Sequence, residues 1–217
     1  NKPDLVIMTA AKVGGIFAND NYPADFIYEN LQIQNNIINS SRQNNVKKLI
    51  FIGSSCIYPR NCKQPIKEKY LLSGKLESTN QWYAIAKIAG IKLVQSCRKQ
   101  YGCNYVSVMP TNMYGPNDNF DDKNSHVLAA LVKKFCLAKV HNKKEVVVWG
   151  TGKPLREFLH VDDFSRALIH VSENYNEEEP INIGSNEEIS IINLAKMISK
   201  ILKYKGKIVL DKNFPDG

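Results

Sequence analysis

A serine, a tyrosine and a lysine have the types and spacing needed to act together on a carbonyl group. Tyr83 and Lys87 are four residues apart in a stretch rich in Ala, Ile and Leu, so a helix would place both side chains on one face. An ammonium near a phenol favours the phenolate, so we expect Lys87 to lower the pKa of Tyr83. Ser54 follows an apolar stretch that ends at Gly53, and its hydroxyl could bond a substrate carbonyl while the tyrosine donates its proton.

The spacing of Tyr83 and Lys87 is not specific by itself, because many helices carry such a pair on their solvated surface. The sequence around the pair decides between the two interpretations. Ser54 would lie at the carboxyl end of a buried strand, which is where open α/β sheets bind their ligands. The Ala-rich helix around Tyr83 could pack closely on that sheet. These features favour a catalytic Ser–Tyr–Lys group over a surface pair.

Strands and helices alternate along the chain, as they do in a doubly wound sheet. The predicted strands cover residues 5–11, 48–53, 105–110, 145–149, 181–183 and 207–210, and the predicted helices cover 23–44, 82–100, 125–139, 163–174 and 190–204. Asp163 is the expected N-cap of the helix that starts there. The stretch at 48–53 is continuously apolar, as expected when both faces of a parallel sheet are covered. The predicted fold class is α/β, with a partial doubly wound, Rossmann-like parallel sheet and a smaller α/β region that binds substrate.

Composition narrows the classes of function. The chain has 217 residues, 43% of them hydrophobic and 23% charged, as in ordinary globular domains. No apolar stretch is long enough to span a bilayer and no secretory leader is recognisable, so we expect no membrane partner. The five cysteines form no C-x-x-C pair, which predicts a reducing cytoplasm and no metal site. The net charge of +8 comes largely from scattered lysine doublets without an arginine-rich run, so nucleic acid is not expected as a partner.

Six motifs together resemble the extended, nucleotide-sugar-modifying branch of the short-chain dehydrogenase/reductase superfamily, and within it the GDP-L-fucose synthase family. They are AAKVGGI (10–16), YPADFIYEN (22–30), GSSCIYP (53–59), YAIAKIAGIKL (83–93), MPTNMYGPNDNF (109–120) and REFLHVDD (156–163). The similarity continues to the final Pro215-Asp216-Gly217. REFLHVDD occurs in many extended members, whereas AAKVGG followed by GSSCIYP is much more specific.

The resemblance implies a two-stage reaction on a GDP-linked 4-keto-6-deoxy sugar, in which C3 and C5 are epimerised and NADPH then reduces C4. Ser54, Tyr83 and Lys87 would serve the reduction. Cys56 and His126 would exchange protons at the carbons beside the carbonyl. From the residues alone, Cys56 could equally be inert packing, and His126 a helix cap or a surface group.

The same resemblance implies the binding residues. NADP(H) would contact Ile52, Gly53, Ser54, Ser55, Lys87, Pro110, Thr111, Asn112, Met113 and His126. The substrate would contact Lys134, Trp149, Arg156 and Asp216, with the Arg156 guanidinium suited to a bidentate grip on phosphate. The alternatives are a surface lysine at 134, a core tryptophan at 149 and a structural ion pair at 156.

The glycine-rich turn that receives a dinucleotide pyrophosphate has no counterpart in this sequence. Family members begin with that unit, so we expect a chain that lacks the first strands of its sheet and also the family's C-terminal end. Residues 1–114 would form the dinucleotide-binding domain, 115–155 a substrate segment, 156–185 a return to the first domain, and 186–217 an incomplete second substrate segment. We expect these 217 residues alone to bind NADPH weakly and to be marginally stable, because their first strand would be an exposed edge.

Two other functions remain open. Another extended nucleotide-sugar enzyme, such as a 4-epimerase or a 4,6-dehydratase, would share Ser54, Tyr83 and Lys87 but would not need Cys56 and His126. A non-catalytic, cofactor-sensing protein would keep the fold without turnover. In either case, the apolar surfaces of the predicted helices 23–44 and 82–100 favour pairing across a two-fold axis, and we expect a homodimer.

Overall fold

The computed structural model describes residues 2–121, 124–214 and 216. In chain order the elements are β1 (Leu5–Met8), α1 (Ile16–Asn21), α2 (Pro23–Gln43), β2 (Lys48–Ile52), η1 (Ser55–Ile57), η2 (Glu68–Tyr70), α3 (Gln81–Tyr101), β3 (Asn104–Pro110), β4 (Asn112–Tyr114), α4 (Val127–Val140), β5 (Glu145–Trp149), β6 (Leu155–His160), α5 (Val161–Asn174), β7 (Ile181–Ile183), β8 (Glu188–Ser190), α6 (Ile191–Ile201) and β9 (Lys207–Asp211). Pro215 and Gly217, at the end of the family resemblance, lie outside the described residues.

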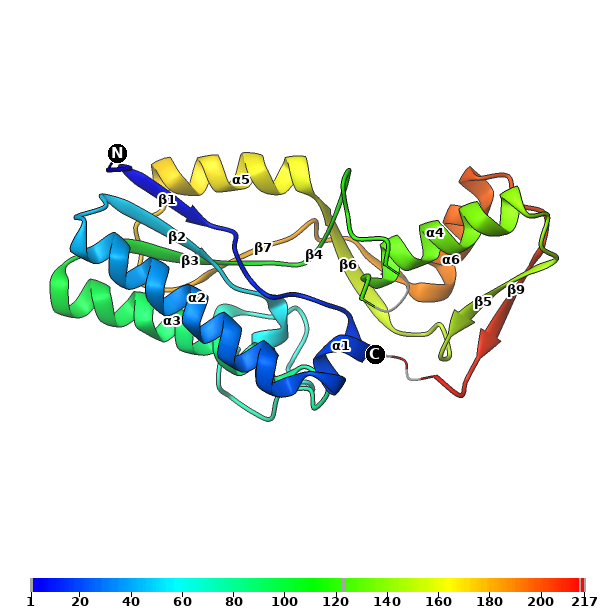
Figure 1. Ribbon diagram of the computed structural model, residues 1–217, viewed down its shortest axis with the longest axis horizontal. Coiled ribbons are helices and arrows are strands. Elements are labelled where there is room, and N and C mark those ends of the chain that lie inside the picture. The colour runs from blue at the N-terminus through cyan, green and yellow to red at the C-terminus, as the bar shows by residue number, and fades with distance from the viewer. Residues whose placement is uncertain (1, 122–123, 215, 217) are drawn as a thin grey trace.

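The larger lobe is a parallel sheet with helices on both faces (Figure 1). Its strand order is β1-β2-β3-β7, and β1 pairs with β2, β2 with β3, and β3 with β7, all in parallel. Helices α2 and α3 cover one face and α5 covers the other (Figure 1). This arrangement confirms the predicted α/β fold class.

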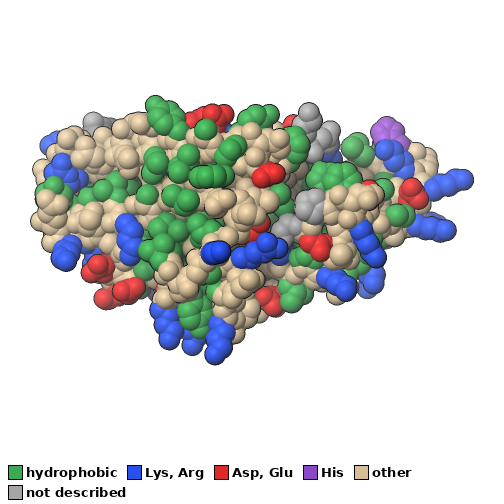
Figure 2. Space-filling view, turned by 90° about the horizontal axis from the view of Figure 1, so that it is seen from below, with side chains coloured by type: hydrophobic (Ala, Val, Ile, Leu, Met, Phe, Trp, Pro, Cys, Tyr) green, Lys and Arg blue, Asp and Glu red, His purple; other side chains and the backbone are tan. Residues whose placement is uncertain are grey.

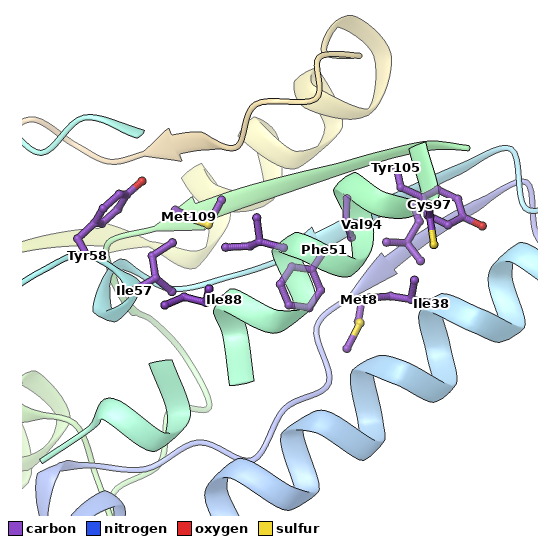
Figure 3. Packing of buried hydrophobic residues seen from close by; sticks show 12 residues of the cluster. Met8, Ile38, Phe51, Ile57, Tyr58, Ile88, Val94, Cys97, Tyr105 and Met109 are labelled. Carbon is purple, nitrogen blue, oxygen red and sulfur yellow. The ribbon is translucent and has the colours of Figure 1, made fainter. Parts of the chain in front are cut away.

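The core of this lobe lies between the sheet and the pair α2 and α3 (Figure 3). Phe51 of β2, Tyr105 of β3 and Ile38 of α2 are fully buried there. Gly90 lets α3 approach closely, because a Cβ at this position would collide with the Phe51 ring and would lie 2.8 Å from Oε1 of Gln34. The close approach brings the first turns of α3 to the carboxyl end of β2.

The smaller lobe contains α4, α6 and the parallel strand pair β5 and β9 (Figure 1). Phe135 of α4 and Ala195 of α6 are fully buried in its core. A three-stranded sheet of order β4-β6-β8 joins the two lobes, with β4 directly after β3 and β6 directly before α5. The proposed division of the chain into four domain segments remains a prediction.

Several predicted elements match the structure to within one or two residues, and a few do not. The strand predicted over 5–11 ends at Met8, because the following residues form a loop held by side chains of α1 and α2. The N-cap of α5 is His160 and not Asp163: the His160 imidazole accepts the backbone N–H of Asp162, and Asp162 and Asp163 lie in the first turn. The strands β4, β6 and β8 and the short helix α1 are additional to the prediction.

Strand β1 is an edge strand of the larger sheet and is only partly covered. Val6 and Met8 point into the core beneath α2 and α3, so Leu5 and Ile7 face the opposite side. There α5 covers Ile50 of β2, but Leu5 and Ile7 keep 40% and 37% of their surface exposed. An exposed apolar edge can recruit a further strand, from the same protein or from another chain.

We predict that Ile7→Lys makes the 217-residue polypeptide several-fold more soluble, because a charge on an edge strand disfavours pairing with another chain. The matched control is Ile169→Lys on α5, where the apolar side chain is 58% exposed but lies on no strand edge. Light scattering at increasing protein concentration would measure the effect. An equal gain from both variants would show that general surface polarity, and not the β1 edge, controls solubility.

Candidate active site

The carboxyl end of β2 carries two of the predicted catalytic groups, Ser54 and Cys56, in one turn of chain. Gly53 hydrogen-bonds through its N–H to Val108 O at 2.8 Å, and a Cβ at this position would collide with Sδ of Met109. The chain then turns into η1, with Ser54 as its N-cap. The Ser54 Oγ lies 2.9 Å from Sγ of Cys56 and accepts the Cys56 N–H at 3.3 Å. The hydroxyl and the thiol are therefore direct neighbours.

Lys87 joins α3 to this strand end. Its ammonium is buried, with 3% of the residue exposed, and Nζ donates a hydrogen bond of 2.9 Å to Ile52 O. Nζ also lies 5.7 Å from the ring centroid of Tyr83 and 5.1 Å from that of Phe51. Burial lowers the pKa of Lys87 to about 8, partly offset by the nearby thiol of Cys56.

Tyr83 lies in the first turn of α3, over the Ser54 and Cys56 pair. Burial raises the pKa of Tyr83, proximity to Cys56 adds to the rise, and a hydrogen bond with Ser54 opposes it. The pKa of Tyr83 is therefore shifted in the direction opposite to the expected one, because loss of hydration is the largest contribution and Lys87 is not among the groups that set the shift. The phenol is held protonated, which is the state a proton donor requires.

Burial also raises the pKa of the Cys56 thiol, while the Ser54 hydroxyl and Lys87 lower it. A further contribution that raises it comes from Glu77, just before α3. The Glu77 carboxylate accepts the backbone N–H groups of Thr79 at 3.0 Å and Asn80 at 3.2 Å, which orders the chain entering the helix. Glu77 was not among the predicted site residues, since a carboxylate in a loop has no signature apart from its partners.

The cofactor residues predicted from the resemblance lie on two neighbouring strand ends. Ile52 to Ser55 follow β2, and Pro110 to Met113 run from the end of β3 into β4. Thr111 hydrogen-bonds through its N–H to Ile183 O at 3.1 Å, and its Oγ1 is buried without a hydrogen-bond partner among the described residues. Ile52 O is the single hydrogen-bond acceptor of Lys87 in the described part of the chain, so the other ammonium protons remain for a ligand. These groups fit a nicotinamide and its ribose.

His126 is placed apart, at the N-cap of α4 in the smaller lobe. It is exposed, and its imidazole makes no capping hydrogen bond. The backbone just before it contacts the loop that follows β1, since Gly15 N donates to Asn124 O at 3.1 Å. The start of α4 is therefore tied to the loop that follows β1.

The predicted substrate residues Lys134, Trp149 and Asp216 lie in the smaller lobe, and Arg156 lies on β6 of the joining sheet, near Asp216. Trp149 is 46% exposed, so it is not a core tryptophan; its ring stacks on Phe214 at 4.4 Å, and Nζ of Lys134 lies 4.7 Å from its centroid. The Asp216 carboxylate accepts the Thr151 hydroxyl at 2.8 Å, and hydrogen bonds from Thr151 with nearby Lys153 and Arg156 lower its pKa. Aromatic, cationic and acidic groups thus lie together. Phe214 belongs to this group and was not predicted from the sequence.

A cavity of about 280 Å³ lies between the loop at 114–120 and α4, with Phe120, Leu128, Val132 and His160 among its lining residues. It does not include Ser54 or Tyr83. Within the described ranges, no three His, Cys, Asp or Glu side chains lie close enough together to hold a metal ion. No helix in the described part of the chain combines the length and hydropathy that a bilayer span requires.

Similarity to known proteins identifies the family of this chain. Residues 1–184 match the NAD dependent epimerase/dehydratase family. The chain belongs to this family. It is 56% identical over 216 residues to GDP-L-fucose synthase 1 of Arabidopsis thaliana, a match that covers all of this chain and 67% of the relative. This confirms the resemblance to the GDP-L-fucose synthases.

Solved structures agree. A GDP-6-OMe-4-keto-L-xylo-heptose reductase from C. jejuni has a TM-score of 0.94 at 39% identity, covering 100% of this chain and 73% of that one. A GDP-L-fucose synthetase from Naegleria fowleri bound to NADP has a TM-score of 0.90 at 34% identity, covering 100% and 67%. The chain thus spans about two thirds to three quarters of these proteins.

We predict that the buried ammonium of Lys87 makes stability rise with pH. Below about pH 8 both folded and unfolded states hold the proton, and burial of the charge destabilises the fold. Between about 8 and the ordinary lysine pKa of 10.5, the folded state releases its proton first, so stability increases. Lys87→Met has no charge to bury, so it avoids this cost below about pH 8. Its free energy of unfolding relative to that of wild type should therefore fall by up to about 3 kcal/mol as pH rises through this window.

Urea unfolding of both proteins at about pH 7 and about pH 10 would measure the change. Lys92→Met, which removes an exposed ammonium from the same helix, is the control. A pH dependence that is the same in wild type, Lys87→Met and Lys92→Met would contradict the prediction.

Proposed function

We propose that the protein as encoded converts GDP-4-keto-6-deoxy-D-mannose to GDP-L-fucose by 3,5-epimerisation followed by NADPH-dependent 4-reduction. The observation that carries this proposal is the thiol of Cys56 within 2.9 Å of the Ser54 hydroxyl, inside the group formed with Tyr83 and Lys87. A reductase needs only the serine, tyrosine and lysine. An additional thiol beside them supplies the acid–base group that exchange at carbon requires.

NADP(H) is the proposed cofactor. The family uses a nicotinamide dinucleotide, and the Naegleria fowleri relative is bound to NADP. Lys87 would donate to the nicotinamide ribose and Thr111 Oγ1 would bond the cofactor near the end of β3, since both have unused hydrogen-bonding capacity there. When bound, the reduced nicotinamide supplies the hydride that C4 receives.

Epimerisation comes first and depends on the 4-keto group. Ser54 Oγ donates a hydrogen bond to the carbonyl oxygen, which makes the neighbouring C–H bonds more acidic by stabilising an enolate. Inversion requires a proton to leave one face of the carbon and another to arrive on the opposite face. We assign these two roles to Cys56 and His126, which come from opposite lobes.

Reduction follows at the same carbonyl. As C4 accepts the hydride, its oxygen becomes more basic and takes the phenolic proton of Tyr83. The raised pKa of Tyr83 keeps that proton in place until the step occurs. The Lys87 ammonium, 5.7 Å from the ring, stabilises the phenolate that forms.

The GDP moiety would lie against the smaller lobe. Arg156 suits a bidentate contact to phosphate, and Lys134 adds positive charge. The stacked rings of Trp149 and Phe214 offer an aromatic surface to the base. The Asp216 carboxylate, which accepts bonds from the Thr151 N–H and hydroxyl, could also accept from N–H groups of the base. The Arabidopsis thaliana relative and the C. jejuni reductase are both named for GDP-sugars.

The similarity to a heptose reductase supports one alternative function, that of a GDP-sugar 4-reductase without epimerase activity. A 4-epimerase or 4,6-dehydratase would likewise need only Ser54, Tyr83 and Lys87. A cofactor-sensing protein without turnover is disfavoured, because these three groups are assembled with their hydrogen bonds intact.

We predict that Cys56→Ser slows epimerisation by about 100-fold or more, the usual contribution of a positioned acid or base. NADPH binding should not change, since Ser54 and Lys87 remain. The product formed from GDP-4-keto-6-deoxy-D-mannose would be identified by NMR. Cys136→Ser, which alters a half-buried free thiol on α4, is the control. Unchanged yield of GDP-L-fucose from Cys56→Ser would favour the functions that need no thiol.

We also propose a homodimer in a reducing cytoplasm. Figure 2 shows hydrophobic side chains gathered on the larger lobe, seen from the side of α2 and α3. Tyr28 of α2 and Trp82 and Ile85 of α3 are exposed by 64%, 39% and 39%. The free cysteines are compatible with a reducing compartment.

Sedimentation equilibrium should show that Ile85→Glu shifts the dimer to monomer. A monomeric wild type would rule the dimer out.

A further inference from the structure

The backbone just before His126 is fixed by a glycine of the opposite lobe. Gly15, in the loop after β1, donates its N–H to Asn124 O at 3.1 Å. A Cβ on Gly15 would lie only 2.9 Å from Ser125 O, closer than side-chain carbons approach carbonyl oxygens in folded proteins. The position of the two residues that precede His126 therefore depends on the absence of a side chain at position 15.

Two buried asparagines hold the loop itself. Asn30 of α2 is 2% exposed; its amide donates to Lys12 O at 3.0 Å and its Oδ1 accepts Lys12 N at 3.0 Å, as a paired strand would. Asn19 of α1 is 6% exposed and donates to the carbonyls of Gly14 at 2.8 Å and Gly15 at 3.1 Å. A buried amide with satisfied donors is a strong constraint, since breaking it leaves polar groups without partners. These hydrogen bonds thus constrain the loop at Lys12, Gly14 and Gly15.

The same loop also contacts the reductase side of the site. A Cβ on Gly14 would lie 3.1 Å from Cζ of Phe26, and the Phe26 ring packs edge-on against Tyr83 at 6.4 Å between centroids. Within the described residues, His126 has no side-chain hydrogen bond to fix it. A path of direct contacts therefore runs from Tyr83 through Phe26 and the loop to the backbone at His126.

We infer that Gly15, held by Asn30 through the loop at 12–15, is a positioning residue that sets the place of His126 relative to the Cys56 and Tyr83 group. This inference rests on the proposed function, because it assigns His126 to proton exchange at carbon. Neither Gly15 nor Asn30 touches substrate in this assignment. Their role is to fix the distance between an acid and a base carried by two lobes, on which exchange depends steeply.

The experiment uses the protein as encoded and separates exchange from reduction. Exchange is followed as incorporation of solvent deuterium at C3 and C5 of the sugar. Reduction is followed in reverse, as the initial rate at which GDP-L-fucose reduces NADP⁺, which requires no epimerisation. We expect Gly15→Ala to slow exchange about tenfold or more, as displacement of a catalytic group by a fraction of an ångström does, and to change the reverse reduction less than twofold.

A double variant distinguishes positioning from general damage. If Gly15 acts through His126, Gly15→Ala added to His126→Ala should cause no further loss of exchange. Losses that multiply would overturn the inference, as would equal losses of exchange and reduction. Asn30→Ala provides the second variant should Gly15→Ala fail to fold, because it loosens the loop without adding an atom; the same non-additivity with His126→Ala is expected.

The matched control is Gly206→Ala. A Cβ there would lie 2.7 Å from Lys144 O and would collide with the Tyr204 side chain, a contact tighter than that at Gly15 and beyond the far end of α4. It tests whether crowding alone in the smaller lobe slows exchange. Loss of exchange in this control equal to that in Gly15→Ala would contradict the inference. Absence of exchange in the wild type would instead show that the proposed function is wrong.

Discussion

The buried ammonium of Lys87 is the constraint on which the site depends. Removing this charge from water is unfavourable, as the lowered pKa shows, and its hydrogen bond to Ile52 O is the compensation within the described chain. The bond fixes the first turns of α3 against the carboxyl end of β2, so Tyr83 meets Ser54 and Cys56. Close packing at Gly90 makes the approach possible. The hydrogen bond from Lys87 to Ile52 O thus both stabilises the packing of α3 and arranges the proposed catalytic groups.

In the proposed mechanism the chemistry is divided between two lobes for a physical reason. Inversion at a carbon needs groups on opposite faces of the sugar, which one sheet edge cannot supply. The larger lobe offers a thiol, a hydroxyl and a phenol at adjoining strand and helix ends, and the smaller lobe offers an imidazole at the start of α4. The small sheet of β4, β6 and β8 and the contact of Gly15 with Asn124 couple the lobes.

Much of this could be predicted from sequence, because the relevant signals are local. A continuous apolar run identified β2, helical periodicity identified α2, and a stretch rich in Ala, Ile and Leu identified α3. The predicted bounds of both helices lie within one residue of the structure. The Tyr83 and Lys87 spacing predicted their shared role at the edge of the sheet, and the structure brings both to Ser54 and Cys56. The strands β4, β6 and β8 were not found, because three to six residues without clear alternation carry little periodic signal.

Other features depend on residues far apart in the chain and have no local signature. The pKa of Tyr83 was predicted in the wrong direction, since spacing shows a nearby ammonium but not the burial that raises the pKa. The bonds that constrain the loop at 12–15 come from Asn30 and Asn124, which its own residues do not reveal. Phe214 was overlooked because its stacking partner is 65 residues away.

The central claim is that one strand edge supports both proton exchange beside a carbonyl and reduction of that carbonyl. Incubation of the protein as encoded with GDP-4-keto-6-deoxy-D-mannose and NADPH in heavy water tests it most directly. The account predicts GDP-L-fucose carrying deuterium at C3 and C5, with a protium at C4 that comes from NADPH. A reduced product without deuterium at either carbon, and with the configuration of the substrate at both, would contradict it.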